Sequence, residues 1–177
     1  MTTKPAIQLR NYIRTIPDFP KPGINFKDIS PLLADGEAFS ECISELAVHM
    51  PEGVDAIVGI ESRGFLFGAA LALLTGKGFV PIRKPGKLPA DTHAIEYELE
   101  YGTDVLEIHR DALSQGHKVV IVDDLLATGG TAAATIQLVE QLGAEVAACL
   151  FVIELDFLHG RKKLGDTPTV SLLHYND

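Results

Sequence analysis

Two adjacent acids stand between an apolar stretch and a loop of small residues in the segment 119–131, whose sequence is VVIVDDLLATGGT. Four β-branched residues in succession are typical of a strand covered on both faces, and such strands form parallel sheets, which bind ligands at their carboxyl ends. Asp123 and Asp124 can accept hydrogen bonds there from the vicinal hydroxyls of a sugar. Backbone amides of the following loop can turn toward a phosphate at the start of the next helix. The segment therefore predicts a site for a phosphorylated sugar, with the phosphate against Ala127, Thr128, Gly129, Gly130 and Thr131.

This segment has two other interpretations. P-loop NTPases also carry an acid after an apolar strand, where it holds magnesium, but they require a Gly-x-x-x-x-Gly-Lys-Ser/Thr loop, which does not occur in the sequence. A purely structural turn between strand and helix, with a threonine cap, explains Thr128 and Gly129. Such a turn does not explain the paired acids, so the sugar-phosphate site is the preferred interpretation.

A second junction between a strand and a helix lies at residues 59–65, whose sequence is GIESRGF. Its two glycines permit close backbone approach, which suits an anion bound by amides. The guanidinium of Arg63 can donate paired hydrogen bonds to a phosphate or a pyrophosphate. The alternative is an arginine that pairs with a surface carboxylate.

Positive charge is concentrated at Arg83, Lys84 and Lys87, although the formal net charge of the chain is −9. The overall charge argues against nonspecific binding of nucleic acid, because a polyanion would be repelled. One local basic spot in an acidic protein suits a small, highly phosphorylated ligand. Taken alone, Lys84 and Lys87 would be interpreted as a solvated charge cluster.

Phe26 and Glu100 are candidates for contact with a flat base. The prolines and glycine of residues 17–28, PDFPKPGINFKD, fix a rigid path that leaves Phe26 able to stack, although a phenylalanine is more often a core residue. Glu100, which precedes Tyr101, could be a general acid or base toward a ring nitrogen, whereas a salt bridge is the commoner role of such a glutamate. The histidines show no spacing typical of metal ligands and are interpreted as surface or satisfied residues, namely His49, His93, His109, His117, His159 and His174.

Apolar periodicity predicts alternating strands and helices, and hence a doubly wound α/β fold with a mainly parallel central sheet flanked by helices. Residues 84–94 lack this periodicity and carry two prolines, so they are predicted to form a mobile loop. The alternating segment 96–102 would return the chain from this loop to the sheet. Strands are predicted at 55–60, 78–83, 118–123, 146–155 and 170–173, and helices at 37–50, 64–75 and 131–142.

The 177 residues contain no repeat or linker, so a single domain, residues 1–177, is predicted. Cys42 and Cys149 have apolar neighbours and are expected to be core thiols, which suits a reducing cytoplasm. The sequence begins without a hydrophobic signal region, and its longest apolar run is too short to span a bilayer. A cytoplasmic protein with no membrane or nucleic-acid partner is therefore expected.

Five segments resemble the adenine phosphoribosyltransferases of purine salvage, along nearly the whole chain. They are VVIVDDLLATGGT, GIESRGF, PDFPKPGINFKDISPLL, RKPGKLP and YELEYG. The first is shared by the wider class I phosphoribosyltransferases and indicates only the donor, 5-phosphoribosyl 1-pyrophosphate, whereas the other four indicate the adenine branch. The resemblance implies an enzyme that converts adenine and this donor to AMP and pyrophosphate, with Mg²⁺, as a homodimer. It also implies an N-terminal hood at about residues 1–34, a flexible lid at about 84–99, and often a non-proline cis peptide bond within GIESRGF.

The resemblance further implies a role for each residue of the site. Asp123 and Asp124 would bind the ribose hydroxyls, and the loop 127–131 would bind the 5-phosphate. Glu100 and Arg63 would be catalytic, the first by accepting a proton from N7 of adenine and the second by binding pyrophosphate. Mg²⁺ would be held by pyrophosphate, ribose hydroxyls and water rather than directly by side chains. The remaining substrate contacts would come from Ser62, Arg83, Lys84, Lys87, Tyr101, Phe26, Lys27 and Leu155.

Within this set, Phe26 and Leu155 would sandwich the purine, and backbone atoms near Asn25 and Lys27 would read its edge. Arg83 could act across the dimer interface. Because backbone contacts leave no side-chain signature, the choice of adenine depends on the resemblance. The alternatives are a phosphoribosyltransferase for a 6-oxopurine, chiefly xanthine, and a non-catalytic sensor of the donor that regulates transcription. The sensor would need a DNA-binding segment or a basic surface, and this acidic chain offers neither.

Overall fold

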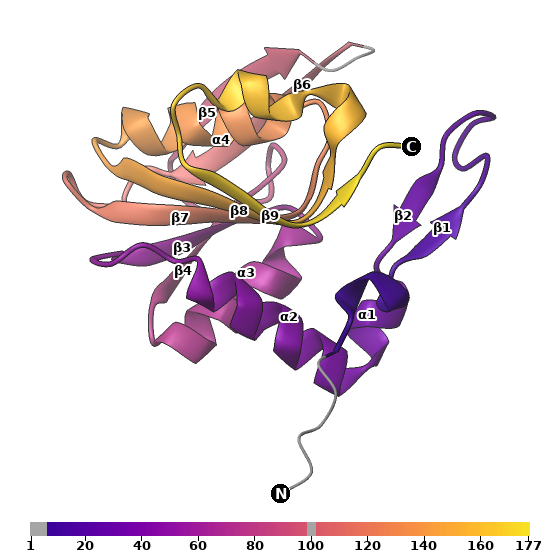
Figure 1. Ribbon diagram of the computed structural model, residues 1–177. Coiled ribbons are helices and arrows are strands. Elements are labelled where there is room, and N and C mark those ends of the chain that lie inside the picture. Colours follow the sequence, from indigo (N-terminus) through magenta and orange to yellow (C-terminus); the bar gives the residue numbers. More distant parts are fainter. Residues whose placement is uncertain (1–6, 99–101) are drawn as a thin grey trace, which may run out of the picture.

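A five-stranded sheet, parallel throughout, is the centre of the structure (Figure 1). The computed structural model describes residues 7–98 and 102–177. The strand order is β4-β3-β7-β8-β9, so β7, which carries the acid pair, lies in the middle. The bounds of the strands are β3 Ala56–Ile60, β4 Gly78–Ile82, β7 Lys118–Leu126, β8 Glu145–Leu155 and β9 Thr169–Tyr175.

Helices cover both faces of this sheet, α2 and α3 on one side and α4 on the other (Figure 1). The apolar run of β7 serves both faces, because successive side chains of a strand point in opposite directions. Val120 and Val122 belong to the core beneath α2 and α3, whereas Val119 and Ile121 belong to the core beneath α4. The helices are α1 Ser30–Ala34, α2 Gly36–Val48, α3 Gly64–Thr75 and α4 Gly130–Gln141.

The predicted doubly wound fold is confirmed, and each predicted strand and helix of the central layer is present within three residues at either end. The largest difference is at β7, which was expected to end at Asp123 and continues to Leu126. It continues because Leu125 and Leu126 pair with Ile153 and Glu154 of β8. The acids therefore lie within the strand, where the sheet holds their backbone rigidly.

The prediction for the segment after β4 was wrong in two respects. Thr92–Glu98 form the strand β5, so the irregular loop ends before residue 92 instead of at 94. This strand does not return to the central sheet but pairs antiparallel with β6, Thr103–His109, which was not predicted. The hairpin packs on the α4 side of the molecule, where Leu106 and Ile108 are fully buried in the core (Figure 1). The alternating segment was expected to bury its apolar side against the central sheet. In the structure the hairpin buries that side in the core beneath α4 instead.

The first part of the described chain forms a separate small unit beside the sheet. A 3-10 helix, η1 Leu9–Tyr12, leads into an antiparallel hairpin made of β1 Arg14–Ile16 and β2 Phe26–Asp28, and the Pro-rich loop joins its strands. In Figure 1 this hairpin projects away from the sheet, next to the end of the yellow C-terminal segment. Two further 3-10 helices, η2 Asp156–Leu158 and η3 Gly160–Leu164, connect β8 to β9.

Cys42 and Cys149 are free and buried, as predicted, and they belong to the cores on opposite faces of the sheet. Burial raises the pKa of each thiol to about 12, so both stay protonated near neutral pH. Among residues 7–98 and 102–177, no helix has the length and apolar character needed to cross a membrane.

Replacement of Ile108 by alanine is expected to lower the free energy of unfolding by about 2–5 kcal/mol, because a fully buried side chain would leave a cavity. Urea denaturation followed by circular dichroism measures this loss. Glu96→Ala, at an exposed position of the same hairpin, is the control and is expected to change the free energy by less than about 0.5 kcal/mol. Equally small effects of both substitutions would show that the hairpin is not anchored to the core.

Candidate active site

A cavity of about 390 Å³ opens at the carboxyl ends of β3 and β7. The small-residue loop, the GIESRGF segment and the hairpin β5–β6 all contribute to its wall. The structure thus brings together most of the predicted sugar-phosphate and pyrophosphate residues. Those that line the cavity are Ser62, Arg63, Lys84, Asp123, Asp124, Ala127, Thr128, Gly129, Gly130 and Thr131.

The acid pair is held in a site nearly closed to water. The side chain of Asp124 is 5% exposed, and its Oδ2 lies 3.0 Å from Nε of Arg63. Burial raises the pKa of both carboxyls; the charge of Asp124 raises that of Asp123 further, whereas Arg63 lowers that of Asp124. Arg63 therefore pairs with a carboxylate, but with one inside the cavity instead of one on the surface.

The small-residue loop presents backbone amides to the cavity. Its Gly129 has a left-handed backbone (φ of 80°), precedes the first residue of α4, and has no side-chain capping hydrogen bond. The first amides of a helix have no carbonyl partner within the helix, so this end is suited to an anion. Thr131 also donates a hydrogen bond of 3.3 Å from its hydroxyl to the Tyr97 hydroxyl.

Close contacts at three glycines fix this loop and the acid pair. A Cβ on Gly160 would lie 2.1 Å from the carbonyl oxygen of Ala127, and a Cβ on Gly129 would lie 2.2 Å from that of Gly160. At the acid pair, a Cβ on Gly64 would lie 2.8 Å from Oδ1 of Asp123. Only glycine fits at these positions, so η3 and the start of α3 fix where the loop and the acid pair lie.

Tyr97 is a cavity residue that the sequence analysis missed. Its hydroxyl donates to Oδ2 of Asp104 over 3.4 Å and accepts from Thr131, and Asp104 also pairs with Lys84. Tyr97 belongs to the alternating segment from which only Glu100 and Tyr101 were chosen. Its place among the apolar positions of this alternating segment was the signal that the sequence offered. Its hydrogen-bond partners come from β6 and α4, which residue spacing does not reveal.

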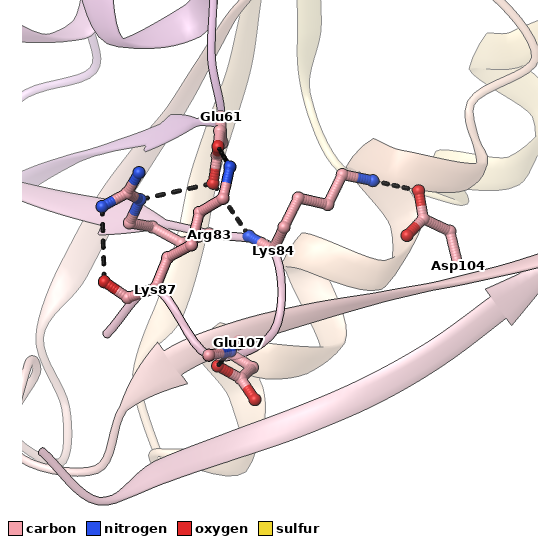
Figure 2. A network of polar contacts seen from close by, with 7 residues as sticks. Glu61, Arg83, Lys84, Lys87, Asp104 and Glu107 are labelled. Carbon is pink, nitrogen blue, oxygen red and sulfur yellow. Dashed lines mark hydrogen bonds and ion pairs between the residues drawn. The ribbon is translucent and has the colours of Figure 1, made fainter. Parts of the chain in front are cut away.

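Glu61 gathers the predicted cations beside the cavity (Figure 2). Its carboxylate accepts hydrogen bonds from Nε of Arg83 over 3.3 Å, from the backbone N of Lys84 over 2.9 Å, and from Nζ of Lys87. Arg83 and Lys87 do not line the cavity, whereas the Lys84 side chain reaches across to Asp104 (Figure 2). The basic residues are therefore internally paired and do not form a solvated cluster.

The pKa of Glu61 reflects this pairing. Burial, which leaves the side chain 9% exposed, acts to raise it. The hydrogen bonds from Lys87, Lys84 and Arg83 together outweigh burial and lower the pKa to about 2. The carboxylate therefore stays ionised and bound to these groups throughout the physiological pH range.

Phe26, Lys27 and Leu155 do not line the cavity, although Phe26 contacts Arg63, which does. Phe26 is half-buried in β2, meets the ring of Phe19 edge-on at 5.1 Å, and lies 5.5 Å from the guanidinium carbon of Arg63. It belongs to neither core cluster, so its position favours the stacking hypothesis over a core role. Leu155 is half-buried at the last position of β8.

Other predictions for the site have mixed outcomes. Glu100 and Tyr101 lie outside the described residues. The peptide bond between Glu61 and Ser62 is cis, as the resemblance implied. Within the described part of the chain, one group could hold a metal ion: Glu154, Asp156 and His174. Spacing gave no sign of it, because the fold joins β8, η2 and β9.

This group lies outside the wall of the cavity. None of its members lines the cavity, and the carboxylate of Glu154 already accepts hydrogen bonds from Arg161 and Ser171. Nδ1 of His174 lies 2.8 Å from Oδ1 of Asp156, so the histidine is satisfied, as expected. The group is therefore explained as a structural network of ion pairs.

A parallel sheet whose central strand carries paired acids near its carboxyl end, followed by an uncapped helix start, is typical of phosphoribosyltransferases, and the phosphoribosyl transferase domain family matches residues 25–171. An adenine phosphoribosyltransferase of Chloroflexus aurantiacus is 58% identical over 168 residues, which cover 94% of this chain and 97% of the relative. By this similarity the chain belongs to the adenine phosphoribosyltransferases.

Solved structures agree with this assignment. The adenine phosphoribosyltransferase of Thermoanaerobacter pseudethanolicus superimposes with a TM-score of 0.92 at 57% identity, over 94% of this chain and 98% of that one. The enzyme of Saccharomyces cerevisiae, solved in complex with an imino-altritol bisphosphate and adenine, gives a TM-score of 0.89 at 48% identity, over 93% and 96% of the two chains.

Replacement of Gly160 by alanine is expected to displace the small-residue loop, because the new Cβ would overlap the carbonyl of Ala127. Affinity for ribose 5-phosphate, measured by calorimetry, is expected to fall about tenfold or more, since a shift of about 1 Å at such a site has effects of this size. Gly78→Ala is the matched control, because a Cβ there meets nothing within 4 Å. Unchanged affinity in the Gly160 variant would argue against the backbone contact.

The pairing of Glu61 predicts a pH dependence of stability. The folded-state pKa of about 2 is below the ordinary value of 4.5, so the contribution of the carboxylate is complete above pH 4.5 and is lost as the pH falls toward 2. The difference in unfolding free energy between the wild type and Glu61→Gln is therefore expected to shrink across this range. A carboxyl resonance of Glu61 that titrates near 4.5 would contradict the network.

Proposed function

We propose that the cavity binds 5-phosphoribosyl 1-pyrophosphate and that the chain transfers its phosphoribosyl group to adenine, giving AMP and pyrophosphate. The observation that carries this proposal is the acid pair beside the uncapped start of α4, within one cavity. A diol and a phosphate can bind there together. The names of the relatives, and the yeast enzyme solved with adenine, support adenine as the acceptor and do not favour a 6-oxopurine or a sensor role.

The ribose would be held by the acid pair and the loop. Asp123 and Asp124 accept hydrogen bonds from the two ring hydroxyls, and the amides of 127–131 bind the 5-phosphate. Loss of pyrophosphate develops positive charge on the sugar ring. Two carboxylates in a site of low dielectric would stabilise this positive charge on the ring. Burial disfavours their ionised form, so a positive partner is especially favourable there.

Pyrophosphate would be held by Arg63, Ser62 and the backbone of 61–64, with cationic contacts from Lys84, Arg83 and Lys87. For this, the cations must leave their present partners: Arg63 must leave the carboxylate of Asp124, and Lys87 must leave the carboxylate of Glu61. The donor supplies more negative charge than a single carboxylate, so the exchange is favourable. Arg63 would act in catalysis by stabilising the departing oxygens.

Mg²⁺ would bind at the same place. The cavity offers carboxylate and backbone oxygens, and its described lining has no cysteine or histidine, which suits a hard cation with oxygen ligands. The ion would be coordinated by pyrophosphate, the ribose hydroxyls and water. When bound, it supplies positive charge that stabilises the leaving group.

The base would lie between Phe26 and Leu155, with its edge against the backbone near Asn25 and Lys27. Glu100 would accept the proton from N7 while N9 attacks the sugar, which strengthens a weak neutral nucleophile, and Tyr101 would contact the substrate. The irregular part of the predicted lid, residues 84–91, would close over the site and exclude water, which otherwise competes for the activated sugar, whereas residues 92–98 are held in β5.

The chain would act as a homodimer in the cytoplasm. Leu66 and Leu73 are 46% and 85% exposed, and because they are seven residues apart they share one face of α3, next to Leu74, which is 57% exposed. An apolar helix face of this kind is suited to a second copy. The buried free thiols of Cys42 and Cys149 suit a reducing compartment.

A purine panel tests the activity. With magnesium and donor present, release of pyrophosphate is expected to be fastest with adenine and weak with hypoxanthine, guanine and xanthine, since a 6-oxo group would leave buried polar groups unpaired. Faster release with any 6-oxopurine would reject the adenine assignment. Donor binding without release by any purine would favour the sensor.

The double variant Asp123→Asn, Asp124→Asn is expected to lower kcat/KM for the donor by about 100-fold or more, because two charge-assisted hydrogen bonds are lost. Initial rates at varied donor concentration measure this effect. Asp166→Asn, at an exposed position outside the cavity, is the control. Donor kinetics equal to those of the wild type would contradict the diol role.

A further inference from the structure

A buried lysine links the hood to the central sheet. The side chain of Lys27 is 2% exposed, and its Nζ lies 4.4 Å from the centroid of the Tyr175 ring, 3.1 Å from Oδ1 of Asp177 and 3.4 Å from the hydroxyl of Thr15. An ammonium group removed from water is costly unless charged or polar partners replace its hydration. Tyr175 and Asp177 supply most of that replacement.

Tyr175 is itself held firmly. The residue is 9% exposed, and the guanidinium carbon of Arg10 lies 4.4 Å from its ring centroid. Nη2 of the same arginine donates to the backbone oxygen of His174 over 2.8 Å. The ring therefore meets one cation from η1, the exposed Arg10, and another from β2, the buried Lys27.

This cluster connects the two residues proposed to enclose the base. Lys27 follows Phe26 in β2, and neighbouring side chains of a strand point to opposite faces, so the lysine anchors the strand while the phenylalanine faces Arg63. On the other side of the cluster, Tyr175 is the register partner of Leu155 in the sheet. No ladder pairs β2 with the central sheet among the described strands, so side-chain contacts such as this one must fix the separation between them.

We propose that Tyr175 and Asp177 are positioning residues for the purine: through Lys27 they set the distance between Phe26 and Leu155. The inference rests on the proposed base site and adds to it a role for the Lys27 side chain. Neither Tyr175 nor Asp177 lines the cavity. Their effect is therefore expected on the base and not on the donor.

Steady-state kinetics with each substrate varied in turn test this proposal. Tyr175→Leu and Asp177→Asn are each expected to raise KM for adenine about tenfold, the equivalent of about 1.4 kcal/mol, while KM for the donor stays within about twofold. Asp177→Glu, which keeps the charge, is expected to restore most of the adenine affinity. Asn176→Ala, at the exposed position between the two, is the control.

The outcomes separate this inference from the activity itself. Thermal unfolding of each variant is measured first. If a variant fails to fold, Lys27→Arg and Lys27→Met are compared in its place. Lys27→Arg, which keeps a cation above the ring, is expected to retain more adenine affinity than Lys27→Met. An unchanged KM for adenine, or a parallel rise of both KM values, would overturn the positioning role. A wild-type protein that does not use adenine would instead reject the proposed function.

Discussion

The burial of two neighbouring carboxylates at the end of β7 is the constraint on which the rest of the structure depends. Asp123 and Asp124 repel each other and have lost most of their water, so the fold must place them rigidly and offer them positive partners. The continuous apolar strand provides the rigidity, because both its faces are covered by helices. Arg63 provides one such partner. During the proposed reaction, the donor's diol and the positive charge that develops on its ribose ring would replace Arg63 as the partners of the two carboxylates.

Regions far apart in the sequence meet around the proposed base and phosphate positions. The hood brings Phe26, the end of β8 brings Leu155, and η3 brings the backbone of Gly160 against the loop 127–131. Because η2 and η3 directly follow β8, the segment that ends with Leu155 also supports the phosphate loop. The proposed base and phosphate ends of the site are thus connected through one short stretch of backbone, residues 155–160.

The sequence was sufficient for the central sheet, because a run such as Val119 to Val122 has few environments other than a strand buried on both faces. It also indicated the paired acids and the loop after them, since these residues are consecutive. It did not indicate the hairpin β5–β6 on the α4 side, because an alternating pattern does not specify which surface it covers. The partners of Tyr97, the pairing of Glu61 with three groups of the following loop, and the contact of Gly129 with Gly160 depend on tertiary proximity and could not be predicted from spacing.

The carboxylate of Glu61 is a built-in anion that occupies cations of the proposed pyrophosphate site. It is attached to the chain, so it competes for Lys87 and Arg83 at an effective concentration on the order of millimolar. A singly bound anion such as inorganic phosphate, which is abundant in cells, gains little by displacing it. The donor's pyrophosphate, proposed to contact several cations at once, would overcome this competition. A tethered acid of this kind would keep the site available to its own donor in a solution crowded with simpler phosphates.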